Sequence, residues 1–354
     1  VALGLEKADV LTRIGRPKRA EAELDGLRGL LSGADRYRAL HKHSLIHLCN
    51  LRMNKALKTS REALRAAEAG ENTEALWWLW HDYAELCLYC GHVTEAGKAA
   101  SRALSAAEDV LSLWGSIWSL IMISRTHLRA LRPAGALESV ERAERLAERT
   151  DDPETMAGAQ LVAALALSVC GRTGEAAAKL HSASCWGVID PLVLTYARVR
   201  RGLLAGSSGT SEEGRLALAA LESRRSPLEL VPSSLVCNHD IRLLACEAIL
   251  EEDPEDALGT LRGMDLEEYP RGRLWRARLE ASALKARGEE ESAGNALRSV
   301  LADGRTRTET LERLMLYRSA GELLPEGAER LRRLSRRLRS ECGGTAEREV
   351  DGAE

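Results

Sequence analysis

The chain has 354 residues, with 50 lysines and arginines against 53 acidic residues and a formal net charge of -3. This balance argues against a dedicated nucleic-acid-binding protein, because phosphate contacts require a basic excess. No apolar run approaches the roughly 20 residues that span a bilayer, and the N-terminus VALGLEKADV lacks a secretory pattern. The eight cysteines are scattered rather than spaced as a disulfide framework. We therefore expect a cytoplasmic protein without membrane contact.

A repeat of 35 to 41 residues runs along the chain, and each unit reads as two helices. We name two sets of residues by their place in it. The anchor alanines open the second helices, at Ala20, Ala56, Ala96, Ala136, Ala176, Ala217, Ala257, Ala293 and Ala328. The small-residue positions lie twelve residues earlier, at Ala8, Ser44, Ala84, Ser124, Ala164, Ala245 and Ala281. Because small side chains let helix backbones approach closely, the two sets predict helices packed in pairs.

Turn and capping signals mark the helix ends. Glycines stand five residues before an anchor, where a positive φ ends the first helix, at Gly15, Gly91, Gly171 and Gly288. A capping aspartate precedes a proline at the first helical position in Asp152-Pro153, Asp190-Pro191 and Asp253-Pro254. Pro133 and Pro325 are expected to begin second helices. These motifs set boundaries and carry no chemistry.

The sixth unit departs from the pattern, because its first helix runs into AGSSGTS at 205–211, which is too rich in Gly and Ser to stay helical. We count the match of Ala205 to the small-residue spacing as accidental. We expect an N-terminal array of about five and a half hairpins at 1–205, and an irregular second helix and connection at 206–233. A C-terminal array at 234–340 would end in a capping helix at 326–339, and an acidic tail at 341–354 would be disordered.

The pattern resembles the tetratricopeptide repeat over about residues 1–335: a small residue in the first helix, glycine at the turn and alanine early in the second helix. The resemblance implies an all-α, right-handed superhelical solenoid of eight to nine hairpins, with first helices lining a concave groove. Most units run to about 40 residues instead of the usual 34. That longer period resembles the regulatory regions of MalT-like bacterial transcription activators and related signalling ATPases.

Candidate binding residues follow from this resemblance. Trp78, Trp118 and Trp275 stand eighteen residues before an anchor, a register that would face the groove. Charged residues continue along the same helices, and the complete candidate set is Trp78, His81, Glu85, Trp118, Arg125, Arg129, Arg242, Trp275 and Arg278. Aromatic and mostly cationic groups would suit an acidic peptide, a C-terminal carboxylate or a small anionic effector. Alternatively, the tryptophans fill gaps between helices and the charges form solvated faces. Three further tryptophans are expected in the core, namely Trp77, Trp80 and Trp114.

Motifs for catalysis are weak or absent. Cys87 and Cys90 have the spacing of a redox motif but lie at a helix end, which favours a buried pair of small apolar residues. His43 and His47 share a helical face, with His41 near them, but Ser44 stands where a zincin would carry glutamate. The sequence holds no phosphate loop, dinucleotide fingerprint or GxSxG elbow. We expect no catalytic residue, cofactor or metal.

The leading functional hypothesis is a non-catalytic scaffold that binds a protein or peptide, an acidic one included, in a bacterial regulatory or assembly system. A first alternative is an effector-sensing domain of a larger transcriptional or signalling regulator. The start at Val1 rather than methionine and the 40-residue period favour it, and nucleic acid would be contacted only through such a parent protein. A second alternative is a metal-dependent enzyme that uses His41, His43, His47 and His81.

Overall fold

The computed structural model describes residues 1–303, apart from 14–15, 32, 51, 208, 223–237 and 267–268, and a few single residues beyond 303. The described residues form sixteen α-helices, one 3-10 turn and no strand. The all-α class is confirmed. Residues 326–328 and 334–354 lie outside the described residues, as does most of the expected capping helix. None of the helices described is long and apolar enough to cross a membrane.

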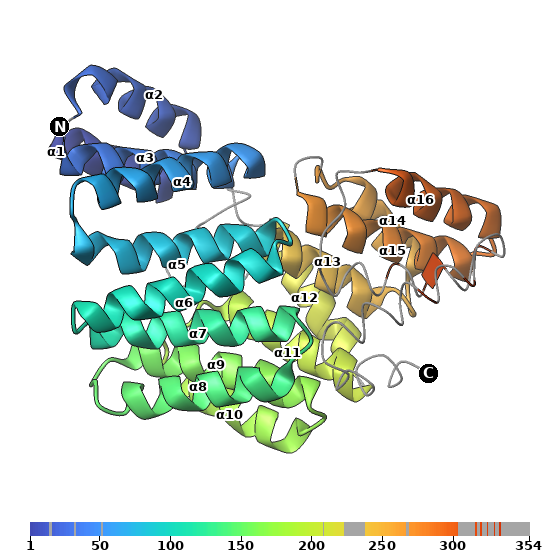
Figure 1. Cartoon of the computed structure of the whole chain (residues 1–354). Helices are drawn as coiled ribbons and strands as arrows, with labels where there is room; N and C mark the ends of the chain where they lie inside the picture. Colours follow the sequence, from blue (N-terminus) through green and yellow to red (C-terminus); the bar gives the residue numbers. More distant parts are fainter. Residues whose placement is uncertain are drawn as a thin grey trace.

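The helices pair in chain order into eight hairpins, within the predicted eight to nine. The first helices are α1 (Ala2–Arg13), α3 (Ala34–Cys49), α5 (Thr73–Tyr89), α7 (Leu113–Arg129), α9 (Pro153–Val169), α11 (Pro191–Ala205), α13 (Asn238–Ile249) and α15 (Pro270–Ala286). The second helices are α2 (Pro17–Leu27), α4 (Met53–Ala69), α6 (Val93–Asp109), α8 (Pro133–Ala147), α10 (Thr173–Cys185), α12 (Thr210–Glu222), α14 (Pro254–Arg262) and α16 (Glu290–Ala302). In Figure 1, α1 to α10 stack in one column, and α13 to α16 extend to its side.

The small-residue positions hold each hairpin together. All seven are at most 1% exposed, and the anchor alanines from Ala20 to Ala293 are at most 2% exposed; Ala328 lies outside the described residues. In the fourth hairpin the Ser124 hydroxyl donates a hydrogen bond to the Ala136 carbonyl oxygen, at 2.8 Å. A small residue of the first helix therefore touches the anchor of the second. The predicted helix pairing is confirmed.

The turn and capping signals are confirmed where the structure describes them. Gly91, Gly171 and Gly288 have φ values of 77°, 72° and 79°; Gly15 and Pro325 lie outside the described residues. Backbone N–H groups of the following helix donate to the side chains of the three capping aspartates, Asp152, Asp190 and Asp253. Pro133 begins α8 as expected. Leu131 takes the turn position in the fourth hairpin, with φ of 56°.

The C-terminal hairpins pack directly against the N-terminal ones. The ring of Tyr89, at the end of α5, lies 6.3 Å from that of Tyr269, just before α15. The Tyr269 hydroxyl donates to Asp240 at 2.6 Å, and Asp240 also forms an ion pair with Arg271. The side chains of this ion pair are both only 2% exposed. We call Tyr89, Asp240, Tyr269 and Arg271 the buried junction, because they join two parts of the chain about 180 residues apart.

The sixth hairpin is more regular than expected. Helix α11 ends at Ala205, where Gly206 is left-handed with φ of 61°, as the Gly- and Ser-rich sequence indicates. Helix α12 is nevertheless a regular α-helix, and it packs on α13 as well as α11. Residues 223–237, most of the expected connection, lie outside the described residues. The division into arrays at 1–205 and 234–340 stays a prediction, while one apolar core includes side chains from both.

The exposed turn residue Leu111 gives a first testable prediction. Leu111 is 90% exposed and has φ of 53°, a left-handed conformation that costs an L-residue about 1–2 kcal/mol. We expect Leu111→Gly to raise the free energy of unfolding by about 1 kcal/mol in urea denaturation. Leu131→Gly is the matched control, because Leu131 has a similar φ but is buried, so its loss should destabilise the protein. A destabilised Leu111→Gly variant would contradict the left-handed turn.

Candidate functional site

Ion pairs link successive first helices. His41 Nε2 of α3 lies 2.5 Å from Asp82 Oδ2 of α5, and Glu85 of α5 pairs with Arg125 of α7 at 3.1 Å. Further along, Glu247 of α13 pairs with Arg278 of α15 at 2.6 Å. We call this set the first-helix ladder, made of His41, Asp82, Glu85, Arg125, Glu247 and Arg278. The structure therefore matches the predicted cations Arg125 and Arg278 with carboxylates of neighbouring helices.

The Glu85–Arg125 pair is the best-defined rung. Both terminal nitrogens of Arg125 lie 3.1 Å from the same Glu85 oxygen, Oε1. The side chains are 20% and 13% exposed, so they are largely withdrawn from water while staying accessible. Burial raises the pKa of Glu85, and Arg125 opposes this rise. The two residues occupy the same register, eleven residues before Ala96 and Ala136; opposite charges one repeat apart are a signal that sequence reasoning missed.

Glu247 organises the second group of predicted residues. It accepts a hydrogen bond from Trp275 Nε1 at 2.9 Å as well as the ion pair with Arg278. Burial alone would raise the pKa of Glu247, but the positive charges of Arg278 and Arg200 outweigh it and lower the pKa. A carboxylate absent from the predicted site thus fixes the orientation of two residues that were in it.

The tryptophan register is only partly open. Trp118 and Trp275 are 7% and 4% exposed, so the expectation of three open groove tryptophans is wrong for these two. Trp118 fills space between α7 and α9, where a Cβ added to Gly158 would lie 3.1 Å from its ring. Trp78 alone is half-buried, and its ring lies 4.6 Å from the ring of His41 in an edge-on contact. The alternative interpretation, gap filling, holds for Trp118 and Trp275.

The other predicted positions lie in different surroundings. His81 faces Trp118 with ring centroids 6.5 Å apart, and its buried Nδ1 has no hydrogen-bond partner among the described residues. Desolvation lowers the pKa of His81 to about 4, so the ring is neutral at pH 7. Arg129 acts on the buried junction, where its charge helps to lower the pKa of Asp240. Arg242 is half-buried on α13 and contributes to lowering the pKa of His239, after burial.

Two further groups of side chains differ in how they meet expectation. Trp114 is 45% exposed and Trp77 is half-buried, so neither belongs to the closed core that was expected for them. Cys87 and Cys90 are buried free thiols, as the helical setting predicts. Burial raises the pKa of both thiols, that of Cys90 to about 12, which disfavours the reactive thiolate.

The histidines do not gather around a common point. The rings of His43 and His47 have centroids 6.3 Å apart. Within the part of the chain that the structure describes, no group of three His, Cys, Asp or Glu side chains is placed to hold a metal ion. Since His41 is engaged by Asp82 and His81 faces Trp118, the four histidines of the predicted alternative are divided among separate contacts.

Comparison with known proteins bears on the fold. No protein-family model matches the sequence, and no curated protein matches it in sequence. The structure is similar to that of a Rap protein complexed with competence and sporulation factor, with a TM-score of 0.52 and 14% sequence identity over 96% of this chain and 98% of that one. The TPR domain of P58(IPK) covers 94% of this chain at 15% identity, but its TM-score of 0.23 is too low to support a conclusion. The chain is thus a tetratricopeptide-like helical repeat.

The ladder gives a second testable prediction. In a double-mutant cycle with Glu85→Gln and Arg125→Met, we expect a coupling free energy of about 2 kcal/mol, because removal of one partner leaves the other charge partly desolvated. The matched control is Glu108–Arg142, a pair that links successive second helices with both side chains about half exposed. Its coupling should stay below about 1 kcal/mol. Equal coupling in the two cycles, measured by urea denaturation, would contradict the partial burial of Glu85 and Arg125.

The neutral state of His81 gives a third prediction. Its folded pKa of about 4 lies below the ordinary value of 6.5, so the unfolded chain binds more protons between these values. Stability contributed by neutral His81 is complete above pH 6.5 and declines as the pH falls towards 4, by at most about 1.4 kcal/mol per pH unit. His81→Gln should therefore show a shallower decline of unfolding free energy over this window. His181→Gln, at an exposed position of α10, should retain the wild-type slope.

Proposed function

We propose that this chain is a non-catalytic scaffold that binds a protein or peptide on the surface formed by its first helices. The observation that carries the proposal is the contact group around Trp78, whose half-buried ring stands beside the His41–Asp82 pair. It offers an aromatic surface next to a partly accessible ion pair, a combination that suits contact with side chains and backbone of a partner. The similar Rap protein, solved as a complex with competence and sporulation factor, supports the use of such a fold for binding.

The candidate contact surface runs from this group along the ladder. We propose that Trp78, His81, Glu85 and Arg125 approach the partner, and that Arg129, Arg242 and Arg278 extend the surface. Trp118 and Trp275 would act from the core, by holding neighbouring helices in place. Since Arg125 and Arg278 are each paired with a carboxylate, we propose recognition by aromatic contacts and exchangeable hydrogen bonds. An acidic partner would have to displace these internal carboxylates.

The setting that we propose is a bacterial regulatory or assembly system. Its support is the period of about 40 residues, which resembles the regulatory regions of MalT-like activators. The alternative is an effector-sensing domain of a larger regulator. The buried junction favours this alternative specifically, because it ties the N-terminal hairpins to the C-terminal ones, so a ligand that moves one set would also displace the other.

Substitution of Trp78 tests the proposal. We expect Trp78→Ala to weaken partner binding by about tenfold or more, since buried aromatic anchors dominate such interfaces. Partners are recovered from native cell extract, identified by mass spectrometry and then titrated as pure protein or peptide by calorimetry. Trp186→Ala is the control, because Trp186 is 45% exposed at the end of α10, away from the ladder. Unchanged affinity in a Trp78→Ala variant with wild-type circular dichroism would refute the assigned surface.

A further inference from the structure

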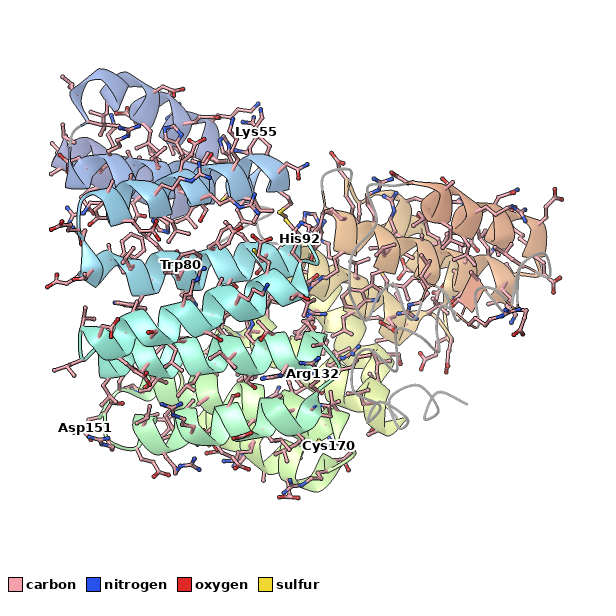
Figure 2. All side chains as sticks on the ribbon, in the orientation of Figure 1. Lys55, Trp80, His92, Arg132, Asp151 and Cys170 are labelled. Atoms are coloured by element: carbon pink, nitrogen blue, oxygen red, sulfur yellow. The ribbon has the colours of Figure 1, made fainter. Side chains whose placement is uncertain are left out.

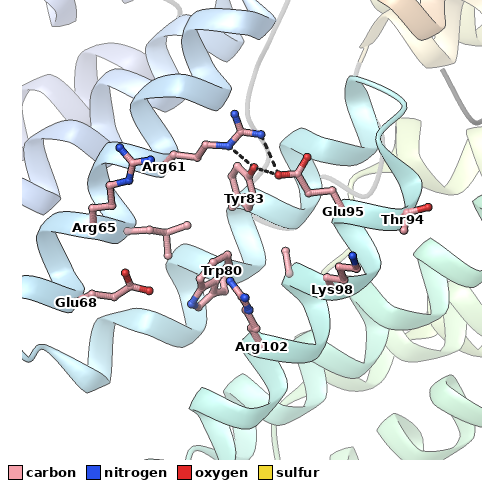
Figure 3. Close-up of a pocket in the computed structure, with 11 residues that line it drawn as sticks. Arg61, Arg65, Glu68, Trp80, Tyr83, Thr94, Glu95, Lys98 and Arg102 are labelled. Carbon is pink, nitrogen blue, oxygen red and sulfur yellow. Dashed lines mark hydrogen bonds and ion pairs between the residues drawn. The ribbon is translucent and has the colours of Figure 1, made fainter. Parts of the chain in front are cut away.

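A recess of about 600 Å³ lies between the second helices α4 and α6. Figure 2 places Trp80 on α5, between these two helices, and Figure 3 shows Trp80 and Tyr83 of α5 at the bottom of the opening. Leu64 and Ala99 complete the apolar part of the lining. The volume is within the usual range of small-molecule sites, about 300–1,000 Å³. Sequence analysis expected Trp80 in the core, whereas its half-buried ring lines this recess.

A hydrogen-bonded wall closes one end of the recess. Arg61 of α4 donates to the Tyr83 hydroxyl at 2.5 Å and to Glu95 of α6 at 2.9 Å, and the Tyr83 hydroxyl also bonds Glu95 (Figure 3). Towards the other end, the Arg102 guanidinium lies 4.7 Å from the centroid of the Trp80 ring. The lining residues of each helix span about two turns, or roughly 11 Å. A short recess with a closed end suits a compact ligand better than an extended peptide.

The charges across the recess break a pattern seen in the neighbouring hairpins. Facing second helices are linked by opposite charges 34 or 35 residues apart, namely Arg61–Glu95, Glu108–Arg142 and Glu144–Lys179. Arg65 and Lys98 also line the recess from α4 and α6, but both are cations. Both are exposed, and neither has an ion-pair partner among the described residues. Two like charges on facing helices repel each other, and an anion bound between them would remove that repulsion.

The aromatic pair at the bottom is particular to this hairpin. Trp80 lies sixteen residues before its anchor, where the next two hairpins carry Leu120 and Gln160. Tyr83 lies thirteen residues before the anchor, where the next hairpin carries Ile123. The two rings meet nearly edge to face, with centroids 5.9 Å apart and an interplanar angle of 75°. An aromatic lining and two unpaired cations thus occur together at one place in the repeat.

We propose that this recess binds a small organic dianion, in which a phosphate monoester or a pair of carboxylates is joined to a flat apolar group. The negative charges lie between Arg65 and Lys98, and the flat group lies over Leu64 and Ala99 beside Trp80. Arg102, stacked on Trp80, stays within reach of the ligand. The site is separate from the first-helix ladder, so it stands or falls independently of the proposed scaffold function.

Calorimetric titration of the full chain with 1-naphthyl phosphate tests this proposal. We expect the Arg65→Gln/Lys98→Gln variant to bind about tenfold or more weakly, because both charge-assisted contacts are lost. Lys58→Gln/Arg145→Gln is the matched control, since it removes the same charge at two exposed positions outside the recess and should keep the wild-type affinity. Circular dichroism of each variant verifies that the helices are intact.

Two partial probes separate the halves of the proposed ligand. Inorganic phosphate carries the charge without the flat group, and 2-naphthol carries the flat group without the dianion; each should bind at least about tenfold more weakly than 1-naphthyl phosphate. Titration with 2,6-naphthalenedicarboxylate then tells whether carboxylates replace phosphate. The proposal is overturned if wild-type protein fails to bind both naphthalene dianions at millimolar concentration. Equal affinity in the Arg65→Gln/Lys98→Gln variant, or equal binding of 2-naphthol, would overturn it as well.

Discussion

The close approach of a first helix to its own second helix is the constraint on which the structure depends. Ser124 shows it most directly, since its hydroxyl reaches the backbone carbonyl of Ala136. A larger side chain at such a position would separate the two helices, and the neighbouring hairpins would follow the displacement. Because every hairpin from α1 to α16 meets this requirement, the outward faces of the helices are left free for ion pairs and aromatic contacts. The first-helix ladder and the recess between α4 and α6 are both consequences of this arrangement.

The sequence was sufficient for the features that depend on local chemistry or a fixed spacing. Ala84 and Ala96 indicated a helix pair because their separation recurs along the chain, and Asp152 indicated a helix start because aspartate before proline has a specific backbone role. Contacts between hairpins were harder to anticipate. The burial of Trp118 depends on the absence of a side chain at Gly158, one hairpin away. The partner of Arg278 is Glu247, and their separation of 31 residues reflects the shorter seventh unit rather than the common period.

The same difficulty explains why the predicted surface was more cationic than the observed one. Sequence reasoning counted Arg125 and Arg278 as charges available to a ligand, whereas each is bound by a carboxylate of the preceding first helix. Charge in a helical repeat has to be assessed across neighbouring helices, because residues far apart in sequence share one face. By this measure Arg65 and Lys98 stand out, as they face each other without a carboxylate between them.

The contact between Tyr89 and Tyr269 distinguishes this molecule from an open repeat array. In an open array each hairpin touches only its neighbours, so whole units can be gained or lost during evolution with little effect elsewhere. Here the hairpins between α5 and α15 must bring two distant tyrosines together, and Asp240 and Arg271 must meet in the same interior. Insertion or deletion of a single unit in that interval would misalign these groups. The number of repeats between the two contact points is therefore fixed, and sequence change in this region is confined to substitutions and to the lengths of loops.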